Sequence, residues 1–172
     1  MIRIVFETHS WTEEMDRGTA TGWLPGGLSA KGRGLAAELG DRRRDVDTVF
    51  TSDLARAVET AEIAFGSSST PILHDWRLRE CDYGERNGAP SLELAKREHL
   101  DLPYPHGESW REAVDRNARF LADLPTRWAG QRVLVIGHVA TRWALDRALT
   151  NQTLESLMDA DFAWREGWEY QL

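Results

Sequence analysis

Four side chains spread along the chain could act together on a phosphate group: His9, Arg56, Glu80 and His138. A neutral imidazole is a competent nucleophile toward phosphorus, and a second, protonated imidazole can stabilise oxygens that gain charge. The guanidinium of arginine presents a fork of donors that fits phosphate oxygens, and a carboxylic acid can give a leaving oxygen its proton. These residue types therefore suit phosphoryl transfer through a phosphohistidine, if the fold brings them together.

The elements that must position these residues can be predicted from hydrophobic periodicity and capping residues. Strands are predicted at residues 2–6 and 46–51, near Ile72, at 133–136, and as a hairpin or edge strand within 162–170. Helices are predicted from Ser29 to Leu39, from Ser52 or Asp53 to Gly66, from Ser91 to Leu100, from Ser109 to Leu124, and from His138 to Leu149. This alternation predicts a three-layer α/β/α fold with a mostly parallel central sheet, in a single domain over residues 1–172.

In open α/β sheets, ligands bind beyond the carboxyl ends of the strands. His9 follows the first predicted strand, Arg56 lies just after the second, and His138 follows the continuous apolar run at 133–136. We therefore expect His9, Arg56 and His138 to surround one pocket at this edge of the sheet. Arg56 and His138 also stand at helix starts, where free N–H groups suit a phosphate.

The composition indicates which classes of molecule the protein can bind. The net charge is −7 over 172 residues, so the molecule has no basic field that would attract nucleic acid or an anionic membrane. A small phosphorylated substrate would need a local positive pocket. The single cysteine, Cys81, excludes an internal disulfide and suits a reducing cytosol. No apolar run has the length of a membrane span, and Met1 leads directly into a predicted strand, so we expect a cytoplasmic protein without a signal peptide.

Two further expectations concern the remaining histidines and the tryptophans. His74, His99 and His106 are expected in surface or loop positions, and the chain has neither a cysteine pair nor an H-x-x-x-H pair on a helix, so no zinc site is expected. The eight tryptophans are scattered, which predicts packing in the core and at its rim. Exposed ones could form a homodimer surface, and the oligomeric state stays open.

The four candidate residues lie in motifs that resemble those of the histidine phosphatase superfamily, the phosphoglycerate mutase-like proteins. ETHS stands where that family has a strand ending in R-H-G, and SDLARAVETA is an almost complete match to S-D-L-x-R-A-x-x-T-A. LRECDYG, HGES and VIGHVATRWAL match three further elements in family order. The resemblance implies that His9 is the phosphorylated nucleophile, Arg56 and His138 bind the phosphate, and Glu80 donates the proton. It also implies a reaction without a metal or a cofactor.

The resemblance also separates phosphatase from mutase activity. In the mutases of this family an arginine follows the acid and grips the substrate carboxylate, whereas here Cys81 follows Glu80. The mutases also carry a longer insertion before the G-G-E-S element, where this chain has only residues 87–105. Both features favour a phosphatase acting on phosphoric monoesters, with phosphomutase activity as the less favoured alternative.

Beside the two histidines the chain departs from the family pattern. Thr8 and Ser10 stand where the family has arginine and glycine, and Val139 stands where glycine is usual. Charge-assisted hydrogen bonds contribute about 1.5–3 kcal/mol each, so losing two would slow turnover by about two to four orders of magnitude. Three interpretations stay open: another cation replaces the arginine, the protein binds a phosphorylated ligand with little or no turnover, or the substrate is not a simple phosphomonoester. Retention of a general acid favours catalysis.

Arg142 is the first candidate for a replacement cation. It lies one helical turn after His138 and would share a helix face with it, with a solvent-facing position as the alternative. Arg17 and Arg33 are weaker candidates near the first loop. Thr8 and Ser10 themselves remain candidate phosphate-binding residues.

Overall fold

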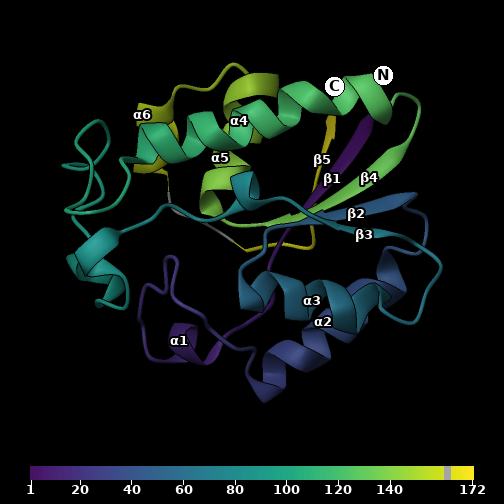
Figure 1. Ribbon diagram of the computed structural model, residues 1–172, viewed down its shortest axis with the longest axis horizontal. Coiled ribbons are helices and arrows are strands. Elements are labelled where there is room, and N and C mark those ends of the chain that lie inside the picture. The colour runs from purple at the N-terminus through teal and green to yellow at the C-terminus, as the bar shows by residue number, and fades with distance from the viewer. Residues whose placement is uncertain (161–163) are drawn as a thin grey trace.

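Figure 1 shows a three-layer α/β/α arrangement in a computed structural model that describes residues 1–160 and 164–172. The central sheet has the strand order β3-β2-β4-β1-β5. Its strands are β1 (Arg3–Thr8), β2 (Thr48–Thr51), β3 (Ile72–His74), β4 (Arg132–Gly137) and β5 (Trp168–Gln171). Only β5 runs antiparallel to its neighbour, at the edge beside β1. The predicted fold class is therefore confirmed, and the single domain over residues 1–172 stays a prediction.

Helices cover both faces of the sheet (Figure 1). Helices α2 and α3 lie on one face, and α4 and α5 lie on the other. The helices are α1 (Glu13–Asp16), α2 (Ala30–Arg42), α3 (Ala55–Phe65), α4 (Trp110–Arg127), α5 (Val139–Leu149) and α6 (Leu154–Asp159). None of the helices in the described ranges is long and apolar enough to cross a membrane.

The apolar run in β4 serves both layers, because successive side chains of a strand point to opposite faces. Val133 and Val135 pack into the core under α4 and α5, whereas Leu134 and Ile136 pack into the core under α2 and α3. All four are fully buried. The prediction of a buried parallel strand at this position is confirmed.

Two predictions about helix ends had different outcomes. The capping box at the start of α4 is confirmed, since Ser109 and Glu112 exchange hydrogen bonds. The predicted cap of α3 is wrong, because the N-cap position is Leu54, without a side-chain cap. The Ser52 hydroxyl lies 2.7 Å from a nitrogen of His138, and Asp53 pairs with Arg79.

The predicted helix from Ser91 to Leu100 is also wrong, since only a short 3₁₀ turn forms at Ser91–Glu93. Ala95 then takes the left-handed conformation with φ of 45°, and the chain turns away. Leu92 is fully exposed, so the segment lacks the apolar face that would hold a helix against the core. Helices α1 and α6 were not predicted; each is short and begins at a threonine cap.

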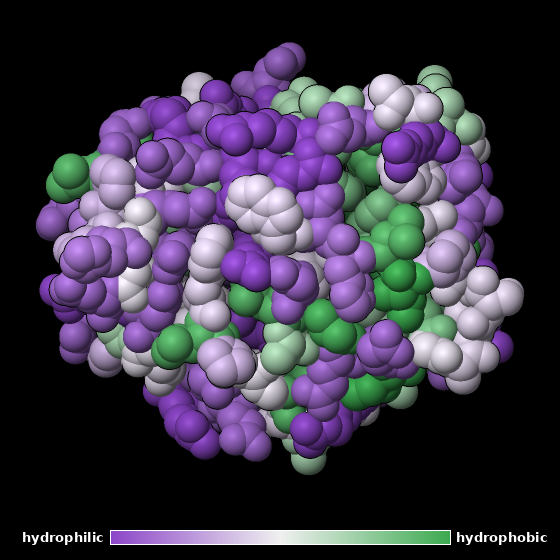
Figure 2. Space-filling model, viewed as in Figure 1, coloured by the Kyte–Doolittle hydropathy of each residue, from purple (hydrophilic) through white to green (hydrophobic). Residues whose placement is uncertain are grey.

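The tryptophans divide between core and surface. Trp110, Trp143 and Trp168 are buried, whereas Trp76 and Trp164 are about half exposed. Figure 2 shows that polar side chains cover much of the visible face and that apolar side chains gather in a band on its right. Packing of tryptophans in the core is confirmed, and a homodimer surface stays a prediction.

Candidate active site

The register of the central strands brings the two histidines together. Thr8 pairs with Gly137 at the ends of β1 and β4, and the N–H of His9 donates to the carbonyl of Gly137 over 2.9 Å. The imidazole rings of His9 and His138 consequently lie with centroids 5.0 Å apart. Parallel strands in register therefore explain why residues so distant in sequence share one site.

Arg56, in the first turn of α3, reaches both imidazoles. Its Nε donates to Nε2 of His9 over 3.3 Å, and its Nη2 lies 3.4 Å from Nδ1 of His138. The carbonyls of Gly22 and Leu24 accept from the same guanidinium over 2.9 and 3.4 Å. Arg56 is only 2% exposed and forms no ion pair with a carboxylate of the described residues. This buried positive charge with neutral partners makes a site for an anion.

The position of the Gly22 carbonyl depends on glycine itself. Gly22 has φ of 55°, and a Cβ there would lie 1.8 Å from Oδ1 of Asn87. Asn87 uses that oxygen to accept the backbone N–H groups of Trp23 and Tyr83. The loop that aims a carbonyl at Arg56 is thus fixed by a close approach between two segments.

The surroundings of His9 select its tautomer and its charge. Its Nδ1 lies 2.8 Å from the carbonyl oxygen of Ser10, which can only accept, so Nδ1 carries the proton and Nε2 keeps its lone pair. Burial lowers the pKa of His9 to about 3, and the nearby charge of Arg56 adds to the effect. His9 is therefore neutral at physiological pH, with Nε2 facing Arg56.

His138 is held in the opposite tautomer. Its Nδ1 faces the guanidinium of Arg56, which only donates, so its proton lies on Nε2, 2.7 Å from Oγ of Ser52. Burial, then Arg56, lowers the pKa of His138 well below its usual range. The expectation of a protonated second imidazole is not met by the protein alone, because no carboxylate of the described residues forms an ion pair with His138. A bound anion would shift this pKa upward.

Glu80 lies in the same pocket, bound to the start of α5. Its Oε1 accepts from the backbone N–H groups of Cys81 and Ala140 over 3.0 and 3.1 Å, and its Oε2 accepts from Val139 over 3.2 Å. The N-terminal N–H groups that we expected to bind phosphate are thus used by this carboxylate. Each carboxylate oxygen has two lone pairs, so Oε2 keeps one that can hold a proton.

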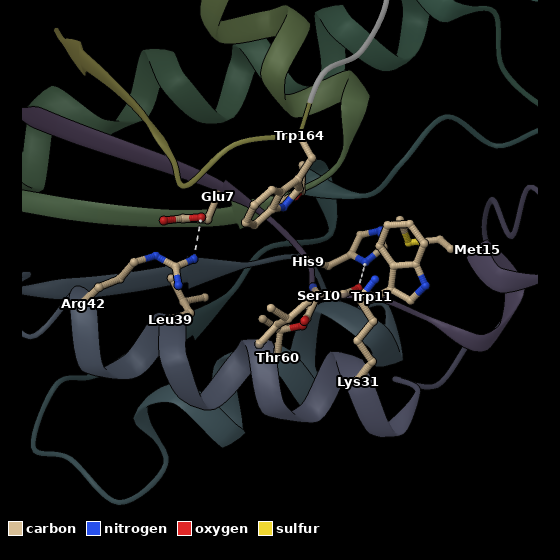
Figure 3. A pocket seen from close by; sticks show the side chains of 12 residues that line it. Glu7, His9, Ser10, Trp11, Met15, Lys31, Leu39, Arg42, Thr60 and Trp164 are labelled. Atoms are coloured by element: carbon tan, nitrogen blue, oxygen red, sulfur yellow. Dashed lines mark hydrogen bonds and ion pairs between the residues drawn. The ribbon is translucent and has the colours of Figure 1, made fainter.

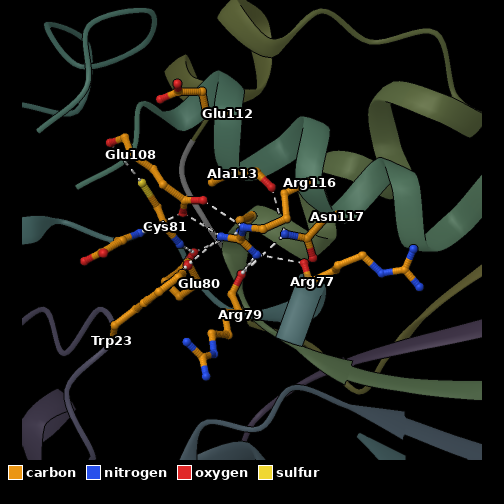
Figure 4. A network of polar contacts seen from close by, with 12 residues as sticks. Trp23, Arg77, Arg79, Glu80, Cys81, Glu108, Glu112, Ala113, Arg116 and Asn117 are labelled. Carbon is orange, nitrogen blue, oxygen red and sulfur yellow. Dashed lines mark hydrogen bonds and ion pairs between the residues drawn. The ribbon is translucent and has the colours of Figure 1, made fainter. Parts of the chain in front are cut away.

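A buried arginine that sequence analysis missed holds the Glu80 segment (Figure 4). Arg116 on α4 donates to the carbonyls of Arg77, Arg79 and Glu80 over 2.8 to 3.0 Å. It also forms a 2.6 Å ion pair with Glu108 of the HGES motif. One sequence signal could have identified this pair. Glu108 stands just before the capping box, and Arg116 follows two turns into α4.

The two residues that flank His9 have different placements. Both hydrogen-bond donors of Ser10 have partners within the protein. Its hydroxyl donates to the carbonyl of Gly32 over 2.6 Å, and its N–H donates to Oγ1 of Thr60 over 2.9 Å. The prediction that Ser10 binds phosphate is therefore not supported, because its donors anchor the β1 end to α2 and α3. Thr8 lines the pocket beside His9, and its role stays a prediction.

Arg142 is not among the residues that line the pocket. Its Nε lies 2.6 Å from Oδ2 of Asp146, and its guanidinium stacks over Trp168 at 4.3 Å from the ring centroid. The i,i+4 carboxylate and the β5 aromatic hold Arg142 on the side of α5 away from His138. The expectation that it projects toward the phosphate site is wrong. The alternative of a solvent-facing position is not observed either, because the Arg142 side chain is only 21% exposed.

Two chambers meet at His9. The catalytic chamber holds Arg56, Glu80 and His138 and has a volume of about 390 Å³. The second, called here the α2 chamber, runs along one side of α2 and has a volume of about 220 Å³ (Figure 3). The residues common to both are Thr8, His9, Trp11, Met15 and Trp164. Within the described ranges no cluster of histidine, cysteine and carboxylate side chains could hold a metal ion.

Comparison with known proteins gives consistent results. The model of the histidine phosphatase superfamily (branch 1) matches residues 4–163. The chain is 32% identical over 152 residues to the uncharacterized phosphatase PhoE of Bacillus subtilis, covering 80% of this chain and 78% of that protein. It is 29% identical over 174 residues to the 2,3-bisphosphoglycerate-dependent phosphoglycerate mutase of Rhodopseudomonas palustris, covering 90% and 84%. The structure of Bacillus stearothermophilus YhfR has the same fold, with a TM-score of 0.84 at 24% identity over 96% of this chain and 88% of that chain.

Proposed function

This chain belongs to the histidine phosphatase superfamily (branch 1), and from that premise we propose that it hydrolyses small phosphorylated substrates, phosphoric monoesters included, through a phosphohistidine at His9. The observation that carries the proposal is the unprotonated Nε2 of His9 beside the buried guanidinium of Arg56, which has no carboxylate partner among the described residues. A phosphoryl group bound by Arg56 and His138 would have its phosphorus within reach of that nitrogen.

The proposed reaction has two steps. Nε2 of His9 attacks phosphorus, the bond to the leaving oxygen breaks, and Glu80 gives that oxygen a proton. Water then attacks the phosphohistidine, Glu80 takes up a proton from the water, and phosphate leaves with His9 restored. Arg56 stabilises the non-bridging oxygens in both steps, and His138 does so after the bound anion has raised its pKa and Nδ1 has taken up a proton. We propose that no metal is needed, since these side chains supply the contacts that a metal would otherwise make.

The covalent intermediate provides the first test. Phosphoramidates are labile to acid and stable to alkali, so label from a substrate should remain on the wild-type protein at high pH and be released on acidification. His9→Ala should carry no label, and a chelator should leave hydrolysis of p-nitrophenyl phosphate unchanged. Activity that survives in His9→Ala, or that is lost with the chelator, would contradict the proposal.

The proton donor has its own test. Glu80→Gln should slow hydrolysis of an alkyl phosphate much more than that of p-nitrophenyl phosphate, because nitrophenolate leaves readily without a proton. Glu85→Gln, on the exposed side of the neighbouring turn, is a matched control. Equal slowing of both substrates by Glu80→Gln would assign Glu80 a structural role at the start of α5.

One observation favours a second candidate, a relative that binds a phosphorylated ligand with little turnover. The N–H groups of Val139 and Ala140 are occupied by Glu80, and Ser10 is occupied by Gly32, so the phosphate has few donors beyond Arg56. Such a protein would show a raised melting temperature with phosphate or vanadate and no release of p-nitrophenol above the His9→Ala background. Phosphomutase activity would instead require transfer of the label to a second acceptor molecule.

A further inference from the structure

The two chambers give a phosphorus atom at His9 two directions in which a substituent can extend. Arg56, the partner of Nε2 of His9, lies in the catalytic chamber, and so does Glu80. A leaving group that receives its proton from Glu80 must therefore occupy the catalytic chamber. Displacement at phosphorus is in line, so the other substituents point sideways from the path of attack. One of them could enter the α2 chamber, which shares Thr8 and His9 with the catalytic chamber.

The α2 chamber is suited to a compact apolar group. Leu35, Leu39, Met15 and Trp164 form the apolar part of its lining. Figure 3 shows Leu39, Met15 and Trp164 around the chamber, with the charged side chains of Lys31, Arg42 and Glu7 at its border. Residues four apart lie on one face of a helix, so Leu35 and Leu39 present a continuous apolar wall. Ligand sites commonly combine such walls with a few polar groups.

The charge at His9 also fits a substrate with a second ester arm. Among the described residues, Arg56 is the one cation that hydrogen bonds to either histidine. Lys96, the other cation of the catalytic chamber, lies over the ring of Trp110 at 5.3 Å from its centroid. A phosphomonoester carries about −1.5 to −2 charge at pH 7, whereas a phosphodiester carries one negative charge. In the α2 chamber, Arg42 is paired with Glu7, and Lys31 lies over the ring of Trp11 at 4.2 Å from its centroid. The one guanidinium that contacts the histidines therefore matches the single negative charge of the diester.

We propose that the site also hydrolyses phosphodiesters whose leaving arm lies in the catalytic chamber and whose retained apolar arm lies in the α2 chamber. This inference rests on the proposed function, because it uses the same nucleophile. Nε2 of His9 bonds to phosphorus, the P–O bond of the leaving arm breaks, and the leaving oxygen takes the proton from Glu80. Water then breaks the P–N bond and gives its proton to Glu80. The products are one alcohol and one phosphomonoester that keeps the retained arm.

Two diesters with the same leaving group test the proposal: methyl p-nitrophenyl phosphate and butyl p-nitrophenyl phosphate. They have the same charge and similar reactivity, so the ratio of their kcat/KM values reports the retained arm. We expect the wild-type protein to prefer the butyl diester at least about tenfold, since three further methylene groups are buried. A ratio from one preparation is insensitive to a general loss of active protein.

Variants of α2 locate the retained arm. Leu35→Trp fills the α2 chamber and should bring the ratio to about one, while Glu38→Trp, exposed on the same helix, should keep the wild-type ratio. Leu35→Ala leaves the chamber open but removes apolar contact with the retained arm, so it should lower the ratio about threefold. This variant keeps the test valid if Leu35→Trp does not fold. A wild-type ratio near one, or a ratio that Leu35→Trp leaves unchanged, overturns the assignment of the α2 chamber.

p-Nitrophenyl phosphate separates failure of this inference from failure of the proposed function. If the wild-type protein hydrolyses that monoester but neither diester above the His9→Ala background, the inference is wrong and the proposed function stands. If it hydrolyses none of the three compounds, both are wrong. Hydrolysis of the diesters with the expected ratio supports the inference, whatever the rate on the monoester.

Discussion

His9 and His138 follow neighbouring parallel strands at the same level of the sheet, and the same guanidinium reaches both. The two imidazoles differ in the hydrogen bonds that they form besides the contact with Arg56. The carbonyl of Ser10 places the proton of His9 on Nδ1, whereas Arg56 and Ser52 place the proton of His138 on Nε2. His9 therefore directs a lone pair from Nε2 into the site, and His138 directs its Nδ1 toward the guanidinium. Single hydrogen bonds thus give two equivalent positions in the fold different proton positions, which suits the proposed roles of His9 as nucleophile and His138 as phosphate-binding group.

The largest effect should separate the two histidines themselves. His9→Ala removes the nucleophile and should lower kcat for p-nitrophenyl phosphate by about 10⁴-fold or more. His138→Ala removes a binding group and should lower kcat/KM by about 10²- to 10³-fold, with phosphohistidine still formed. Equal losses, or no phosphoenzyme in His138→Ala, would break the distinction between the two positions.

Arg56 joins the two histidines, so Arg56→Lys tests whether they act as one site. Lysine keeps the charge but cannot reach both rings and two carbonyls with a planar fork. We expect kcat/KM to fall by about two to four orders of magnitude, the effect of losing two charge-assisted hydrogen bonds to phosphate. Arg33→Lys, an exposed partner of Glu59, provides the control. Near-normal activity in Arg56→Lys would show that charge alone is enough.

Acid should destabilise the protein through both histidines. The folded-state pKa of His9 is about 3, below an unfolded value of about 6.5, so the unfolded chain binds more protons between these pH values. The free energy of unfolding should therefore be complete above pH ~6.5 and fall by a few kcal/mol as the pH drops toward ~3. Denaturant unfolding of wild type and His9→Gln measures this, and a slope that His9→Gln does not reduce would contradict the burial of a neutral His9.

Ser52→Ala should sharpen the comparison with a smaller effect. The hydroxyl accepts the proton of His138 and, among the described residues, forms no hydrogen bond with His9. A neutral hydrogen bond contributes about 0.5–1.5 kcal/mol. We expect KM to rise about two- to tenfold, with kcat and the yield of phosphohistidine nearly unchanged. Ser68→Ala, in the loop after α3, is the control. A loss confined to kcat would indicate that Ser52 acts on the chemical step at His9 and not on phosphate binding by His138.

Arg142→Ala should have the smallest effect on activity, within about twofold of wild type, because Arg142 is paired with Asp146 and does not line the pocket that holds both histidines. A modest loss of stability is expected, since the Asp146 carboxylate is buried and, among the described residues, would keep the Tyr170 hydroxyl as its one side-chain partner. A tenfold loss of activity would restore Arg142 as the replacement for the arginine absent at Thr8.

Sequence alone determined the fold class, and it predicted that His9, Arg56 and His138 lie together at one edge of the sheet. The apolar run of β4 and the capping box at Ser109 depend on neighbours within one or two turns, and such local signals survive in any single sequence. The rule that ligands bind at the carboxyl ends of parallel strands then placed His9 and His138 together, because it needs only the order of the elements.

Tertiary structure decided which hydrogen bonds each of these residues makes. Ser52 is a plausible helix cap by sequence, yet it bonds to His138, 86 residues away. Glu80 caps α5, Ser10 is bound to α2, and Arg142 turns to Asp146. Such partners depend on strand register and on the packing of helices against the sheet, which bring together atoms that no local pattern relates. The proton positions of the two histidines, and hence their proposed roles, follow from those contacts.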